Sequence, residues 1–487
     1  MISEYDITVV LHLADGSSID VSNDVVQYAD QHAIGTIPTW SLTLPHAYQG
    51  TPYTEFLNLG DMVEVSLINY DSRFGVAAEP YTVMVGMVQS LSTPQTTAEN
   101  QASQVASLSG SSLAGPLLNE SISYFLALGY LEGLLKTFSQ LPPDDIQGKS
   151  LAEAMFNFTT RVAFTALRME RPQGTLKDLL SLAFDSVPGI GDFTLLWQQY
   201  EGSFWGFLES YSEQPLNELL IKQTRNLDAF AGSKSYGRVW GEDNSTHAFI
   251  MRPTPYPHSE DGNSVNYGVW NSLPLHNLLE PSLRLHPVNQ QSMTDFDDGI
   301  YNFFLTTPKA FSFDEMSSMT YAPAIINDRE WKRHGYRPLT WGTYLLGEGV
   351  DKAGGAFGDF FTRLNWRLAT QNNRLDGYRG GSVGIRLAPH IGIGERVLLN
   401  HIANDDTTRS MYYVKGVSHN FTRASASTSL TLDRGLPEGA YGNDAVFLDG
   451  LALYSALGAL YKNQGHAESD VTRYDTPGVH RINPRVE

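Results

Sequence analysis

The sequence predicts an α+β protein with two small, tube-like antiparallel β-barrel modules that carry helical and mixed α/β insertions. Three observations favour this class. Short segments near both ends of the chain alternate apolar and polar residues with period two, as half-buried strands do. Two long segments between them change to the helical period. A sequence pattern of a strand, a turn and a hairpin, which we call the repeated phrase, occurs twice: in Leu42–Val65 and from Ile385 onward.

The first module is read from strands with turn residues between them. Alternation predicts strands at Ile7–Leu13, Trp40–Leu44, Val63–Leu67 and Tyr81–Ser90. Short strands in this arrangement are typical of a small antiparallel barrel or sandwich.

Helical periodicity begins at about Asn119. We expect helices over 121–138, 150–169 and 174–184, the first two separated by a segment with two prolines and a glycine. A fourth helix follows Ser203, which is a suitable N-cap, and Pro215 ends it. Asn217–Gln223 then reads as a strand that returns to the first barrel, which makes the helices an insertion.

The second half repeats this order. Strands and loops are expected from Gly232 to about Ala310, helices from Asp314 to about Gly377, and then the second set of strands. Leu448–Tyr461 is apolar nearly all round and predicts a buried helix, packed on its own chain or docked on a partner. The expected domains are 1–116 (first barrel module, with the returning strand 216–224), 117–215 (helical insertion), 225–310 (β-rich domain), 311–380 (helical segment), 381–437 (second barrel module) and 438–487 (C-terminal helix and tail).

The repeated phrase has an acidic tight turn at its centre. Gly60–Val63 matches Gly394–Val397 in residue type and spacing, although any β-meander can produce part of such a pattern. Each turn follows a Pro-His pair, and each precedes a strand with a central glycine. The Pro-His pairs are Pro45-His46 and Pro389-His390, and the glycines are Gly86 and Gly416.

Composition excludes several classes of protein. The absence of cysteine excludes disulfide scaffolds, thiolate metal sites and cysteine nucleophiles. Lys and Arg total 33 against 53 Asp and Glu, a net charge of −20, the opposite of what phosphate neutralisation requires. We find neither a signal peptide nor an apolar run long enough to span a bilayer, and expect a soluble protein made in the cytosol.

Four phrases carry a resemblance to a known family. They are FWGFLESYSEQPLNELLIKQ, FIMRPTPY, LRLHPVNQQSMTDFDDGIYNFFLTT and YYVKGVSHNFTRASASTSLTLDRG, and they occur in this order. The sequence resembles the late-control protein D-like baseplate hub proteins of tailed phages and related contractile injection systems. That resemblance implies two barrels per chain, a homotrimeric ring that adapts a hexameric tail tube to a trimeric spike, and a channel for DNA.

No motif for catalysis, cofactor binding or metal binding is found, so we expect no enzyme and no cofactor. The GIG at Gly392–Gly394 lies between two strands and lacks a third glycine, and SGSSLAG has the wrong serine spacing for a nucleophile elbow. DFDDG lacks the alternating ligands of a calcium loop. The 13 histidines never fall at zinc-motif spacings, and His46 and His390 read as structural strand-end residues.

The candidate residues are therefore structural or interfacial. Phe204, Trp205 and Phe207 are expected to wedge their helix against the first barrel, and Phe360 with Phe361 to act similarly beside the second. Leu451, Leu457 and Leu460 are the candidates in the C-terminal helix. Core packing and direct partner contact both remain open for these residues.

The predicted function is that of a structural hub in the tail baseplate of a virion, assembled in the host cytoplasm. Expected partners are two further copies of the chain, the tail tube protein, the central spike protein and other baseplate proteins. DNA would pass without specific binding, and part of the acidic excess is expected to line its channel. The alternatives are a secreted multidomain carbohydrate-active enzyme and a glycan-binding tail module.

Overall fold

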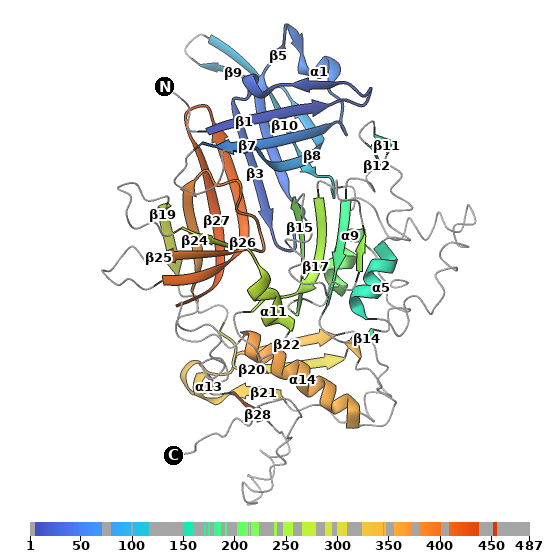
Figure 1. Cartoon of the computed structure of the whole chain (residues 1–487), viewed down its shortest axis with the longest axis vertical. Coiled ribbons are helices and arrows are strands. Elements are labelled where there is room, and N and C mark those ends of the chain that lie inside the picture. Colours follow the sequence, from blue (N-terminus) through green and yellow to red (C-terminus); the bar gives the residue numbers. More distant parts are fainter. Residues whose placement is uncertain are drawn as a thin grey trace, which may run out of the picture.

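The fold is described from a computed structural model of the chain (Figure 1). The described residues are 5–70, 79–98, 101–115, 150–159, 170–171, 174–175, 180–186, 190–191, 202–212, 214, 216–223, 238–240, 247–256, 265–278, 288–294, 300–308, 324–343, 345–346, 355–372, 379–400, 409–437 and 451–454. Within these ranges, no helix has the length and apolar character needed to cross a bilayer.

One sheet runs through both ends of the chain. The described strands assign 14 members to it, which we divide into two units. The first unit contains β1 (Tyr5–His12), β2 (Ser18–Asp20), β3 (Gln27–Ala33), β4 (Thr39–Pro45), β7 (Met62–Asn69), β8 (Tyr81–Ser92), β9 (Gln95–Ala98) and β10 (Gln101–Ser112). The second unit contains β18 (Leu275–Asn277), β19 (Val288–Thr294), β24 (Arg379–Arg386), β25 (Arg396–Asn400), β26 (Arg409–Thr422) and β27 (Ala426–Pro437).

Period-two alternation places one face of each unit in a core. In β4 the buried residues are Trp40, Leu42 and Leu44, while Ser41 is exposed. The second unit buries Val383 and Leu430 in the same way, in a separate apolar cluster. The strands expected in both units are therefore present. The sheet does not confirm two closed barrels, because no pairing among the described strands closes either unit on itself.

A close approach of backbone and side chain fixes the first core. The Trp40 indole donates to the Ser111 carbonyl at 3.2 Å and lies directly over Gly86. A Cβ at Gly86 would lie 2.2 Å from Trp40 Nε1 and 2.7 Å from the Ser111 oxygen. Only glycine fits at that position without a shift of its neighbours.

A four-stranded sheet occupies the middle of the molecule in Figure 1, in the order β15, β17, β13, β16. Its strands are β13 (Leu180–Phe184), β15 (Asn217–Gln223), β16 (Arg238–Trp240) and β17 (His247–Pro253), with helices α5 (Leu151–Phe158) and α9 (Phe204–Tyr211). Two expectations are wrong here. The segment 174–184, expected to be a helix, contains strand β13, because its apolar run pairs in parallel with β17. β15 pairs with β17 as well and is not a strand of the first unit's sheet, although its Leu219 carbonyl accepts the Gly35 N–H of the first unit at 2.8 Å.

A second four-stranded sheet, in the order β22, β20, β21, β28, lies at the lower end in Figure 1. Its strands are β20 (Phe303–Pro308), β21 (Ala324–Asn327), β22 (Pro338–Thr343) and β28 (Leu451–Tyr454). Helix α14 (Gly355–Asn372) packs on β20 and β21, and α13 (Asp328–His334) also lies beside β21. The segment 311–380 is therefore mixed and not purely helical.

The expected C-terminal helix, Leu448–Tyr461, is wrong for its described part. Leu451–Tyr454 forms β28, which pairs antiparallel with β21, and Leu451 is buried there. A short apolar run has the same pattern in a helix and in a strand, and the pairing partner decides between them. Leu457 and Leu460 lie outside the described residues, as does the helix expected over 121–138.

The remaining described elements are short. They are η1 (Ser22–Asp24), β5 (Ala47–Tyr48), β6 (Thr51–Pro52), α1 (Tyr53–Phe56), β11 (Glu170–Arg171), β12 (Gly174–Thr175), β14 (Ile190–Gly191), α11 (Val265–Ser272) and β23 (Leu345–Leu346).

Candidate functional site at the seam between the two units

The two units order six strands in the same way. In chain order the first unit's are β1, β3, β4, β7, β8 and β10, and the second unit's are β18, β19, β24, β25, β26 and β27. Across the sheet, the first unit's strands follow the order β3, β4, β10, β8, β7, β1, and the second unit's follow the order β19, β24, β27, β26, β25, β18. If the strands of each unit are numbered along the chain, both orders read second, third, sixth, fifth, fourth, first. The units differ in their first strand, because β1 is antiparallel to β7 whereas β18 is parallel to β25.

The acidic turn makes the same backbone hydrogen bonds in both units. Gly60 donates to the Val88 carbonyl at 2.7 Å, and Val88 donates to the Asp61 carbonyl at 2.8 Å. In the second unit, Gly394 donates to the Val414 carbonyl at 2.8 Å, and Val414 donates to the Glu395 carbonyl at 2.9 Å. Both glycines have positive φ, 90° and 74°, which favours glycine at this step of the turn.

A register shift also recurs at the same place. Between β8 and β10 the ladder skips Gln89, passing from Val88 to Ser90. Between β26 and β27 it skips Lys415, passing from Val414 to Gly416. A bulge at matching positions makes Ser90 the counterpart of Gly416, and confirms that the two acidic turns are equivalent.

Two other parts of the repeated phrase are not equivalent. Leu42 and Val383 hold the same place, opposite Leu108 and Leu430 of the sixth strands, so Pro45 corresponds to Arg386. The Pro389-His390 pair therefore comes three residues later than Pro45-His46 in the repeat. Gly86 pairs with Val63, and the matching partner of Val397 is Tyr412, so Gly86 does not correspond to Gly416.

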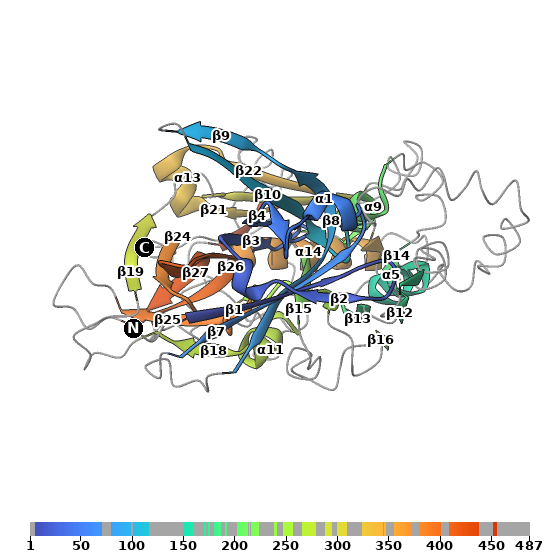
Figure 2. The ribbon, with the colours of Figure 1, turned by 90° about the horizontal axis from the view of Figure 1, so that it is seen from above.

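The two units join edge to edge through β3 and β26, which lie side by side in Figures 1 and 2. β27 occupies one edge of β26. The other edge is shared, with β25 on Arg409–Tyr413 and β3 on Gly416–Thr422. We call this β3–β26 junction the seam.

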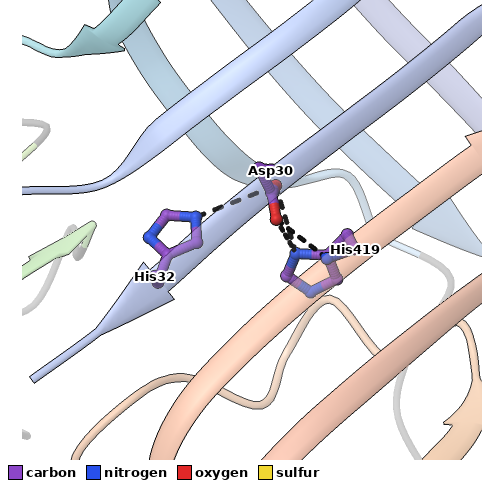
Figure 3. Close-up of side chains that lie close together, drawn as sticks. All are labelled: Asp30, His32 and His419. Carbon is purple, nitrogen blue, oxygen red and sulfur yellow. Dashed lines mark hydrogen bonds and ion pairs between the residues drawn. The ribbon is translucent and has the colours of Figure 1, made fainter.

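A cluster of one carboxylate and two imidazoles lies in the seam (Figure 3). Asp30 and His32 share the buried face of β3, and His419 meets them from β26. Asp30 Oδ1 is 2.9 Å from His419 Nδ1 and accepts the His419 backbone N–H at 2.9 Å, while Oδ2 accepts the Tyr28 hydroxyl at 2.8 Å. Burial alone would raise the pKa of Asp30, but the two imidazoles hold it well below its usual range.

A second buried cluster surrounds the acidic turn of the second unit. Glu395 contacts the Lys222 ammonium of β15 through one oxygen. The other oxygen lies 2.6 Å from His276 Nε2 of β18 and accepts the Gly392 N–H at 2.8 Å. Burial alone would raise the pKa of Glu395, but Lys222 and His276 hold it at about 2. Burial lowers the pKa of Lys222 to about 8, although Glu395 opposes this.

A third network joins the middle sheet to the second unit. Arg252 of β17 donates to Glu218 of β15 at 2.8 Å and to the Gly394 carbonyl at 3.0 Å. The Tyr413 hydroxyl donates to the same Glu218 at 2.5 Å. The second unit is therefore fixed to the middle sheet by buried charges, whose pairing is required because an unpaired buried charge is strongly destabilising.

Each unit also presents an open edge. On β8, β7 pairs as far as Met87, and no described strand pairs with that edge over Gln89–Ser92. On β19, β24 takes one edge, and the described residues place no strand on the other. β19 and β3 are the second strands of their units, so the open edge of β19 is equivalent to the edge of β3 that lies in the seam. β8 and β26 are the fifth strands, so the open edge of β8 is equivalent to the edge of β26 that lies in the seam.

The residues expected from sequence are not brought together. Phe204, Trp205 and Phe207 are buried in α9, whose N-cap Ser203 accepts from the Gly206 N–H at 3.1 Å as predicted. Trp205 lies 5.5 Å from the Phe249 ring, so it packs on the middle sheet. Phe361 is buried in α14, which covers the lower sheet and not the second unit; Phe360 lies in the same helix.

Sequence reasoning missed the Asp30 cluster. Histidine spacings alone give no zinc motif, because the third member is 389 residues from Asp30. One signal was present: the Asp-x-His of Asp30 and His32 places both side chains on the same face of a strand.

Comparison with known proteins found no match among models of protein families and none among curated sequences. Similar solved structures include the tail protein from Neisseria meningitidis MC58, with 12% sequence identity and a TM-score of 0.47, covering 91% of this chain and 99% of that chain. The 43 kDa tail protein of prophage MuSo2 from Shewanella oneidensis has 10% identity and a TM-score of 0.42, covering 89% and 97%. Prophage tail protein gp18 from Listeria monocytogenes EGD-e has 8% identity and a TM-score of 0.41, covering 88% and 95%. All three are described as tail proteins.

Proposed function

We propose that this chain is a structural component of a phage-type tail, a baseplate hub whose copies close into a homotrimeric ring. The observation that carries the proposal is the seam, together with the two open edges that match it. The ring would join a hexameric tail tube to a trimeric spike in the virion, with other baseplate proteins around it.

The seam supplies the rule for joining units. Within one chain, the second strand of one unit (β3) pairs with the fifth strand of the other (β26). The edges left over are the fifth strand of the first unit (β8) and the second strand of the second unit (β19). These are the same two kinds of edge, so β19 of one copy fits β8 of the next.

Such a contact is heterologous, because two different edges meet. Heterologous contacts produce rings when the rotation between copies closes and open filaments when it does not. Three copies contain six similar units, which is the number implied by the family resemblance. A ring of this kind presents six similar faces to a hexamer while it keeps threefold symmetry for a spike.

The exposed face of the joined sheet suits a channel that does not hold DNA. Two rows of paired residues cross β26, β3, β4, β10 and β8 on this face, and none of their residues is charged. The rows are Asn420, Ala29, Ser41, Ser109 and Ser90, and Thr422, Gln27, Thr43, Ser107 and Ser92. Retention of DNA requires cations that neutralise phosphates, and these rows offer none. They also contain none of the acidic residues that we expected along the channel.

The experiment is a pair of Ser-to-Arg variants in one row. Gly416 is buried in the seam, whereas its counterpart Ser90 is exposed in the single chain. Ser90→Arg should leave each chain folded and prevent ring formation, because it places a bulky cation at the proposed contact. Ser41→Arg is the matched control, since β4 is paired on both edges. Native mass spectrometry of the purified chains should show trimers for the wild type and Ser41→Arg and monomers for Ser90→Arg. Trimers of Ser90→Arg, or a monomeric wild type, would contradict the proposal.

One observation favours the alternative of a glycan-binding tail module. Tyr336 is 56% exposed and contacts Trp331 in a tilted arrangement and Phe303 edge to face, with ring centroids 5.2 and 5.3 Å away. Aromatic faces of this kind bind sugar rings. Binding of the wild type to host cell-wall glycans, lost in Tyr336→Ala, would support this second function; equal binding by both proteins would dismiss it.

A further inference from the structure

We propose that Asp30, His32 and His419 form a binding site for one divalent transition-metal ion in the seam. All three side chains are buried, and their potential ligand atoms lie within 4.8 Å of one another. They come from two units of the fold, so an ion held here would connect β3 directly to β26 (Figure 3). This inference is separate from ring formation between copies.

The distance between His32 and Asp30 fits a shared ion better than it fits a direct hydrogen bond, whereas His419 is within hydrogen-bond distance of the carboxylate. His32 Nε2 is 3.8 Å from Asp30 Oδ2, which is too long for a hydrogen bond. Two ligands bound tetrahedrally at about 2.1 Å from one zinc ion lie about 3.4 Å apart. The His419 Nδ1 distances to the two carboxylate oxygens, 2.9 and 3.2 Å, lie on the short side of that value.

His32 supplies an independent indication. Its Nε2 is buried and has no hydrogen-bond partner, although it faces the Asp30 carboxylate. A buried nitrogen in this state costs free energy unless some group satisfies it. A metal ion between His32 and Asp30 would accept the nitrogen lone pair and neutralise the carboxylate at the same time.

The groups around Asp30 prepare the carboxylate for this role. The Tyr28 hydroxyl and the His419 backbone N–H both donate to it and fix its orientation. Metal-binding carboxylates are commonly held by hydrogen bonds of this kind. The ion would replace the direct contact between His419 Nδ1 and the carboxylate.

The donor set selects the class of metal. Two imidazoles with one carboxylate suit zinc and its first-row neighbours, whereas calcium and magnesium prefer oxygen ligands alone. Cobalt(II) is therefore a suitable probe, because its visible absorption reports on the coordinating atoms, and zinc should displace it.

The test uses the full-length protein after dialysis against a chelator. We expect one cobalt ion per chain, a visible absorption band that zinc abolishes, and a higher thermal unfolding temperature with zinc. His32→Asn should bind zinc at least ~10-fold less tightly, because it removes one ligand of a three-ligand site. His12→Asn is the control, since His12 pairs with Glu64 and Ser18 and is not one of the three cluster residues. It should bind like the wild type.

Two outcomes would overturn the proposal. Wild-type protein that takes up no cobalt and shows no zinc-dependent rise in unfolding temperature would show that the cluster is only a hydrogen-bonded ion pair. Equal zinc affinity in the wild type and His32→Asn would place any bound ion elsewhere. Because binding is first measured on the wild type, a variant that fails to fold leaves the test intact. Oligomeric state is scored separately, so a failure here does not touch the proposed function.

Discussion

Removing one partner of the Lys222–Glu395 pair should destabilise the protein far more than removing both. Glu395 is held by the Lys222 ammonium, by His276 and by the Gly392 N–H, and both charged side chains are buried. The perturbations are Glu395→Gln, Lys222→Met and the double variant. Each substitution nearly conserves side-chain volume, so the charges are the main change.

The structure gives the size of the effect. In the folded protein the pKa of Glu395 falls from 4.5 to about 2, which corresponds to about 3 kcal/mol of stabilisation above pH 4.5. The pKa of Lys222 falls from 10.5 to about 8, because burial disfavours its charge, and this costs about 3 kcal/mol below pH 8. The Lys222–Glu395 attraction contributes to both shifts, so the two values are not added; their directions fit a buried ion pair whose attraction offsets much of its burial cost.

The three variants therefore separate pairing from burial. Either single variant should lose about 3 kcal/mol or more, because one buried charge loses the opposite charge of the Lys222–Glu395 pair. The double variant should lose less than either single variant, about 1.5 kcal/mol at most. Urea denaturation at neutral pH, followed by tryptophan fluorescence, measures the three differences.

The control is an exposed pair of the same type. Lys332 and Asp328 lie one helical turn apart in α13 with side chains 76% and 59% exposed, so Lys332→Met should cost about 0.5 kcal/mol or less. The reasoning is refuted if the losses of the two buried single variants simply add in the double variant, since the charges would then be uncoupled.

Two further predictions concern packing and pH. Gly86→Ala should destabilise by about 1–3 kcal/mol, because its Cβ would clash with Trp40 and the Ser111 carbonyl; a urea midpoint equal to that of exposed Ser41→Ala would contradict this. Burial lowers the pKa of His247 to about 3 and that of His390 to about 4, from 6.5 in each case. The unfolded chain therefore binds more protons than the folded chain below pH 6.5. The contribution of these two histidines to stability should accordingly be constant well above pH 6.5 and fall as the pH drops toward 4. Equal urea midpoints at about pH 7.5 and about pH 5 would show that these histidines do not stay neutral in the folded protein.

Local patterns predicted the half-buried strands and the capped helix well. The alternation at Trp40–Leu44 and at Val63–Leu67 arises because one face of each strand is buried and the other is more exposed to solvent. Ser203 was recognisable because an N-cap serine is a local signal. Short apolar runs carry no such alternation. Leu180–Phe184 and Leu451–Tyr454 were therefore assigned to helices, and only their pairing with β17 and β21 decides their structure.

The candidate site depended on contacts that no local pattern contains. The acidic turns were recognised as a repeat because Gly60 and Gly394 need the same backbone conformation. The Pro-His pairs looked equally similar, yet the sheet register separates them. His419 reaches Asp30 only through the seam, and that pairing of β3 with β26 follows from the tertiary arrangement of two distant segments.

A cryo-electron reconstruction of the purified assembly, or of tail particles that contain it, tests the central claim most directly. The account predicts three copies around one axis, with Gln89–Ser92 of each β8 hydrogen-bonded to β19 of the neighbouring copy in the manner of the seam. A particle in which those two edges face solvent, or in which copies meet through other surfaces, would contradict it.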